Sequence, residues 1–175
     1  MRLETNSRTQ DLVHDGFDVG VRSGAGDWPG LESHYLFPWE LTPLCTPAVR
    51  DELGGLADPA DLRRAALIGG ERDWAAWFAA AGLASPKIKA GGQLIADMQT
   101  IGVTSALTGQ GVALGSPLLF APEIERGLLV RPFPIAIAPA GSLWLSYPKD
   151  RRRAAKIAAF RDWLLGAVAA GARAS

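Results

Sequence analysis

The sequence predicts an α/β protein of two lobes, with mainly parallel sheets and two segments that cross between the lobes. Short apolar runs typical of strands alternate with helical patterns along most of the chain. Two proline-marked stretches, residues 41–47 and 134–143, have the extended character of crossing segments. The chain has 175 residues, 48% of them hydrophobic, which suits one domain or two small lobes with a buried core.

In the N-terminal part, residues 2–5 can form a short strand and residues 6–14 a helix that Gly16 ends. The apolar run at residues 17–21 is typical of a strand buried between helices. Three glycines and a Trp-Pro pair then indicate a loop at residues 23–30.

In the middle of the chain, residues 35–44 form a long extended segment interrupted by prolines. Asp58 precedes a proline and is expected to cap a helix, and residues 67–68 form a short strand. A second helix is expected from its cap at Asp73 to Gly82, because aromatic residues recur there at helical spacing. Those aromatic residues are expected in the core: Trp74, Trp77 and Phe78.

Strands and helices continue to alternate toward the C-terminus. The expected strands are residues 88–95, 112–114, 128–133 and 143–147. The expected helices are residues 97–107, 117–125 and 150–170. Residues 109–111 follow a helix, so they are interpreted as a helix-ending turn and not as a phosphate loop. The apolar stripe of the last helix is Ile157, Phe160, Trp163, Leu164 and Val168.

Composition and motifs argue against an enzyme and against a stand-alone nucleic-acid binder. The 18 basic residues balance 18 acidic ones, whereas phosphate binding usually needs a basic surplus. The basic run at residues 149–153 is interpreted as a solvated helix start, with a phosphate-contacting patch as the alternative. His14 and His34 have no partner at metal-ligand spacing. Cys45 lies in an apolar run and is expected to be a buried thiol, so we expect no catalytic residue, metal or cofactor.

Candidate binding residues follow from the rule that ligands in α/β sheets lie beyond the carboxyl ends of strands and at helix N-termini. Residues 22–24, 69–73 and 96–100 meet this condition. Arg22 can hold a carboxylate through two parallel hydrogen bonds. The alternative is that Arg22 pairs with Asp18 or Asp27 as part of the scaffold.

Five segments, in this order and at these intervals, carry a family resemblance. They are DGFDVGVRSGAGDWPGL (15–31), LTPLCTPAV (41–49), DWAAWFAAAGL (73–83), ALTGQGVALGS (106–116) and KIAAFRDWLLG (156–166). Together they resemble the effector-binding domain of LysR-type transcriptional regulators, in particular the subgroup of the glycine-cleavage activator. The resemblance implies a two-lobed, periplasmic-binding-protein-like (type 2) fold with a small-molecule cleft between the lobes. Residues 1–42 and 143–175 would form the first lobe and residues 43–142 the second.

The resemblance also implies a function. It nominates as effector-binding residues Arg22, Ser23, Gly24, Thr46, Asp97, Met98, Gln99 and Trp144. The chain would be the sensor module of a LysR-type regulator, binding a small, anionic metabolite and transmitting lobe closure to a DNA-binding domain. The alternative is a solute-binding protein of a transport system with the same fold.

The chain departs from the family pattern at its N-terminal side. A full regulator begins with a helix-turn-helix domain, and the effector lobe has a strand and helix before the segment matching residues 2–5. Neither is recognised, so we expect a truncated lobe and DNA contact only through a domain absent from this chain. Exposed apolar surface on such a lobe favours a homo-oligomer. Without a signal-like N-terminus or an 18-residue apolar run, we expect a cytoplasmic location and no membrane partner.

Overall fold

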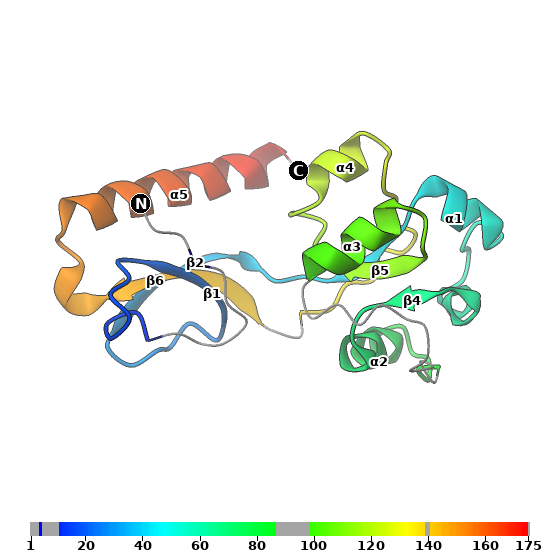
Figure 1. Cartoon of the computed structure of the whole chain (residues 1–175), viewed down its shortest axis with the longest axis horizontal. Coiled ribbons are helices and arrows are strands. Elements are labelled where there is room, and N and C mark those ends of the chain that lie inside the picture. The colour runs from blue at the N-terminus through cyan, green and yellow to red at the C-terminus, as the bar shows by residue number, and fades with distance from the viewer. Residues whose placement is uncertain (1–3, 5–10, 87–98, 139–140, 175) are drawn as a thin grey trace. The chain divides into compact units, whose positions relative to one another are not determined.

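The computed structural model describes residues 4, 11–86, 99–138 and 141–174, and the chain divides into two compact units (Figure 1). Unit 1 comprises Met1–Trp39 and Ala140–Ser175, and unit 2 comprises Glu40–Pro139. The chain therefore leaves unit 1 once and returns to it once. The boundaries that we predicted from the sequence lie at residues 42 and 143.

Unit 1 is built on a three-stranded sheet. Its strands are β1 (Gly20–Gly24), β2 (Leu31–Pro38) and β6 (Ser142–Pro148), in the order β1-β6-β2. The central strand β6 runs antiparallel to both neighbours. Successive side chains of a strand point to opposite faces, so Leu145 and Tyr147 share one face of β6 while Trp144 lies on the other.

The long helix α5 (Ala155–Ala174) covers one face of this sheet (Figure 1). It follows a short 3-10 turn, η2 (Lys149–Arg151), and so begins later than the predicted residue 150. Ile157 of α5 is buried with Leu145 and Tyr147 of the sheet. Partly buried side chains extend the contact along the helix: Phe160, Leu164, Leu165 and Val168.

Trp163 does not belong to this packed stripe, although the sequence predicted that it would. Its side chain is 64% exposed, and it contacts Phe160 with 5.5 Å between ring centres. At the usual rotation of an α-helix, Trp163 is turned by about 120° from Ile157. A residue turned that far from the buried position faces solvent.

Unit 2 contains a second small sheet. Its strands are β3 (Thr42–Leu44), β4 (Leu67–Ile68) and β5 (Val112–Gly115), in the order β3-β5-β4. Strand β5 runs antiparallel to β3 and parallel to β4. Isolated bridges join Leu41 to Ile137 and Cys45 to Val130.

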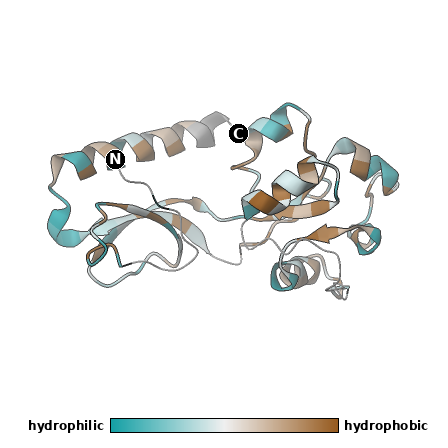
Figure 2. Ribbon diagram, in the orientation of Figure 1, coloured by the Kyte–Doolittle hydropathy of each residue, from teal (hydrophilic) through white to brown (hydrophobic). Residues whose placement is uncertain are grey.

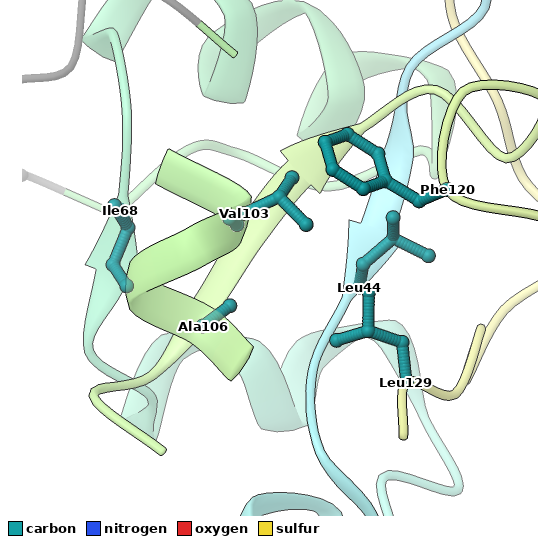
Figure 3. Close-up of a cluster of buried hydrophobic side chains, with 7 residues drawn as sticks. Leu44, Ile68, Val103, Ala106, Phe120 and Leu129 are labelled. Carbon is teal, nitrogen blue, oxygen red and sulfur yellow. The ribbon is translucent and has the colours of Figure 1, made fainter. Parts of the chain in front are cut away.

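Helices surround this sheet. They are α1 (Pro47–Glu52), the 3-10 helix η1 (Pro59–Arg64), α2 (Glu71–Ala80), α3 (Gln99–Leu107) and α4 (Ala121–Glu125). Figure 2 shows the apolar character of β4 and β5. The core between sheet and helices (Figure 3) consists of Leu44, Ile68, Val103, Ala106, Ala113, Phe120 and Leu129. In the described part of the chain, no helix has the length and apolar character needed to cross a membrane.

The aromatic residues of α2 are core residues, as predicted. Trp74, Trp77 and Phe78 have no exposed surface. Both indoles also satisfy their N–H groups, because Trp74 donates to the Ile68 carbonyl and Trp77 to the Ile135 carbonyl, each at 3.1 Å. The carbonyl of Ile68, at the carboxyl end of β4, is therefore occupied by Trp74. The sequence suggested a ligand site at this strand end, at residues 69–73.

The two-lobed α/β class was predicted correctly, but the expectation of mainly parallel sheets is wrong for the described strands. The pairings β1–β6, β2–β6 and β3–β5 are antiparallel, and β4–β5 alone is parallel. β6 brings the chain back into unit 1 and therefore runs opposite to β2, which leads out of it. Apolar runs indicate that a strand is covered on both faces, but they carry no information about its direction.

Several predicted boundaries are also corrected. The strand expected at residues 17–21 begins at Gly20 and continues to Gly24, because its pairing with β6 and not its apolar content defines it. Helix α2 begins after Gly70, which leaves Asp73 in the first turn and not at the cap. The helix expected from residue 117 begins at Ala121.

Four further expected elements differ from the structure or lie partly or wholly outside the described residues. Residues 128–133 form no strand beyond the bridge at Val130, since the prolines in and after this run cannot donate to a ladder. Of the helix expected at residues 6–14, the described part is a turn that Gly16 ends with a φ of +72°. The strands expected at residues 2–5 and 88–95 lie outside the described residues, apart from Glu4, which is in no strand.

The turn before β5 generates a prediction. Gly111 has a φ of +144°, and a Cβ atom there would clash with the carbonyl oxygen of Ala66. Gly111→Ala should therefore lower the free energy of unfolding by about 2–4 kcal/mol, through the clash and the strained backbone. Denaturant unfolding measures this loss. Gly70→Ala is the control, because its Cβ meets nothing closer than 3.8 Å, and an equal loss there would contradict the argument.

Candidate functional site

Four of the residues predicted to bind an effector lie together in unit 1. Arg22, Ser23 and Gly24 form the end of β1, and Trp144 lies directly opposite Arg22 on β6. The sequence placed residues 22–24 in the loop after the strand, whereas they belong to the strand itself. Sheet pairing therefore fixes the backbone of this candidate site.

The indole of Trp144 contacts the glycine-rich turn that follows β1. Its Nε1 donates a hydrogen bond to the Gly24 carbonyl oxygen at 3.0 Å. A Cβ at Gly26 would lie 2.6 Å from the Trp144 ring, so only glycine allows the backbone to approach so closely. The edge of the indole meets Tyr35, with 5.4 Å between ring centres and an interplanar angle of 82°.

Arg22 rests on a second indole, which the sequence analysis did not single out. Its guanidinium carbon lies 5.1 Å from the centre of the Trp28 ring, a cation–π arrangement. Burial lowers the pKa of Arg22, while the charge of Asp11 opposes that shift, and arginine remains protonated at neutral pH. Asp18, one of the scaffold partners considered for Arg22, accepts a hydrogen bond from Lys156 of α5 at 2.6 Å.

The face of the sheet that α5 covers carries a polar cluster that sequence reasoning missed. His34 Nε2 lies 2.7 Å from the Tyr147 hydroxyl, which donates to Glu32 Oε1 at 3.0 Å. Arg161 of α5 also hydrogen-bonds Tyr147, and burial is the largest cause of the raised pKa of this tyrosine. No local motif could have indicated the cluster, because its members come from β2, β6 and α5.

Two of the remaining predicted residues lie in unit 2. Thr46 is the N-cap of α1, and its hydroxyl accepts from the Val49 N–H at 3.3 Å, so this side chain has a structural role. Gln99 is the first residue of α3, and both polar atoms of its side chain are buried with no hydrogen-bond partner in the described structure. Asp97 and Met98 lie outside the described residues.

The described residues offer little for catalysis. They contain no group of three or more His, Cys, Asp or Glu side chains that could hold a metal ion. The Cys45 thiol has no exposed surface, and burial raises its pKa to about 11. Since the thiolate is the nucleophile, such a cysteine is unreactive near neutral pH.

A family model and individual relatives point to the same protein family. The family described as LysR substrate binding domain matches residues 1–169. The HTH-type transcriptional activator AmpR of Pseudomonas aeruginosa is 34% identical over 177 residues, which is 99% of this chain and 57% of that protein. The glycine cleavage system transcriptional activator of Escherichia coli K12 is 32% identical over 172 residues, 97% of this chain and 56% of that protein. The chain thus spans somewhat more than half the length of these relatives.

Solved structures agree with this assignment. The effector domain of AmpR of Pseudomonas aeruginosa has a TM-score of 0.80 at 34% identity, covering 99% of this chain and 82% of that one. The effector-binding domain of AmpR from Citrobacter freundii has a TM-score of 0.76 at 26% identity, covering 91% of this chain and 78% of that one.

The burial of Cys45 generates a prediction about reactivity and pH. A thiol-specific reagent at mildly alkaline pH should leave the native protein unlabelled and should label it once denaturant unfolds it. Ala159→Cys, on the exposed side of α5, is the positive control, and its introduced thiol should react in the native state. If Cys45 in the native protein were labelled as fast as the thiol introduced on α5, the conclusion that Cys45 is buried and unreactive would be contradicted.

The same thiol should make stability fall at high pH. Its pKa in the folded protein, about 11, lies above its ordinary value of 9.0. Folding therefore favours the protonated form, and this contribution to stability is complete below pH 9.0 and is lost as pH rises toward 11. Comparing denaturant unfolding of the protein and of Cys45→Ala across this range isolates the contribution.

Proposed function

Because the chain belongs to the family of LysR substrate-binding domains, we propose that it is the effector-sensing module of a LysR-type transcriptional regulator and binds a small anionic metabolite. Its named relatives are transcriptional activators, not enzymes. In such a protein the sensing module changes DNA binding only if the effector binds one conformation more tightly than another. We propose that contact with DNA is made by a helix-turn-helix domain and that the protein acts in the cytoplasm.

The proposal that the ligand is an anion rests on the position of Arg22. Its guanidinium is partly desolvated above Trp28, at the end of a paired strand, next to the exposed Ser23. A cation in such surroundings interacts with a carboxylate more strongly than one in bulk water. The arrangement therefore supports a carboxylate or a similar planar anion.

The remaining nominated residues extend this proposal. We assign the backbone of Ser23 and Gly24 to effector contact beside Arg22, because strand alternation turns the Ser23 side chain to the other face of the sheet. In unit 2, Gln99 has buried amide atoms that lack a partner in the described structure, and a buried polar group without a partner is costly. A polar atom of a ligand bound to unit 2 would satisfy them. The alternative of a solute-binding protein for transport finds no support among the named relatives, which are regulators.

Arg22→Ala tests the proposal. Calorimetry against amino acids, small organic acids and aromatic acids should identify a ligand of the unaltered protein. The variant should then bind it more weakly by about 2–4 kcal/mol, the cost of breaking a desolvated charge-assisted pair. Arg22→Lys, which keeps the charge but loses the planar fork, should fall between the two. A fall in thermal stability with unchanged affinity would show that Arg22 is a scaffold residue.

We also propose that the protein self-associates. In unit 1, Val21 on β1 is 52% exposed and Trp163 on α5 is 64% exposed. Large apolar side chains in such positions favour association between copies. Light scattering should show a dimer or a larger species, and Trp163→Lys should shift it toward the monomer. A monomeric parent protein at high concentration would contradict the proposal.

A further inference from the structure

The contacts of Trp144 differ from those expected of a side chain that lines a binding site. Its one polar atom, Nε1, donates to the Gly24 carbonyl oxygen at 3.0 Å. Its ring lies 2.6 Å from the position that a Cβ of Gly26 would take, and Tyr35 meets the indole edge-on. The hydrogen-bonding capacity of Trp144 is therefore already used within the protein.

The glycines that Trp144 contacts are connected to Arg22 through Trp28. Gly24 and Gly26 begin the loop that carries Trp28, and the Trp28 ring approaches to 2.9 Å of the Cβ position of Gly24. Trp28 in turn supports the Arg22 guanidinium at 5.1 Å. Gly24 and Gly26 have φ values of +150° and +93°, which few other residues adopt, so this path for the loop is specific to glycine. The Trp144 indole holds the backbone at the start of the loop, and the loop holds the surface on which Arg22 rests.

We propose that Trp144 is a positioning residue for Arg22: it fixes the Gly24–Gly26 turn and thereby holds the Trp28 ring beneath the guanidinium. This inference rests on the proposed function of Arg22, and it replaces the expectation that Trp144 lines the effector site. Trp144 is partly buried and lies on the sheet face opposite Leu145 and Tyr147, so it is not part of the core beneath α5. Its role is local to the turn.

Trp144→Phe tests the role of the hydrogen bond, because phenylalanine keeps an aromatic ring but has no donor. Gly26→Ala is the second variant, since its Cβ would displace the turn from the same ring. Trp77→Phe is the matched control, because this indole also donates to a backbone carbonyl but lies in unit 2. Melting temperatures identify any variant that does not fold. If either Trp144→Phe or Gly26→Ala does not fold, the remaining variant tests the proposal.

The first readout needs no ligand. The Nε–H resonance of Arg22 should carry a ring-current shift from Trp28 in the parent protein. In Trp144→Phe and Gly26→Ala it should move toward the value of a free arginine, and the amides of residues 25–30 should exchange with solvent at least several-fold faster. An unchanged Arg22 resonance in both folded variants would overturn the proposal. The control should match the parent.

The second readout uses acetate as a carboxylate probe, titrated to high millimolar concentration and followed at Arg22, Ser23 and Gly24. Both variants should raise the dissociation constant for acetate by roughly tenfold, while the control leaves it unchanged. Unchanged affinity despite a mobile turn would overturn the positioning role. If acetate fails to shift Arg22 in the parent protein, the anionic-effector proposal fails, and the Arg22 resonance alone then decides the role of Trp144.

Discussion

The pairing of β6 with both β1 and β2 is the interaction on which unit 1 depends. This single strand brings the returning chain between two strands from the N-terminal part. Successive side chains of β6 point to opposite faces of the sheet and therefore have different surroundings. Leu145 and Tyr147 face α5 and form the core, whereas Trp144 faces the glycine-rich turn beside Arg22. A shift of one residue in the register would exchange the two sets and destroy both the core and the candidate site.

The polar cluster around Tyr147 has a place in this arrangement. Tyr147 is buried among apolar residues, and its hydroxyl is satisfied by Glu32 and His34 of β2. Arg161 adds a contact from α5. A partly buried polar network whose members are satisfied costs little and adds directional contacts to the apolar packing of the helix on the sheet. The Lys156–Asp18 pair, exposed to solvent, contributes less to the same orientation.

The sequence predicted correctly those features that depend on neighbouring residues. The helical spacing of Trp74, Trp77 and Phe78 was sufficient to place them in the core of unit 2. Gly82 and Gly109 end helices with positive φ values, as glycines after a periodic apolar run are expected to do. The ordered motifs also identified the family, since they record which strands, turns and helices follow one another. For the candidate site, the sequence nominated Arg22, Ser23 and Gly24 through their position after an apolar strand, and their role in effector binding stays a prediction.

Only the tertiary structure decided the features that join distant segments. Apolar runs do not reveal strand direction, so the antiparallel pairing of β6 with β1 and β2 follows from the path of the chain. The hydrogen bond from Trp144 to Gly24 spans 120 positions, and no local pattern encodes it. Trp28 supports Arg22 because the turn folds back over β1. By itself, then, the sequence determined local conformation and family. The partners of each side chain were decided by long-range packing, because they depend on which surfaces meet when the chain folds.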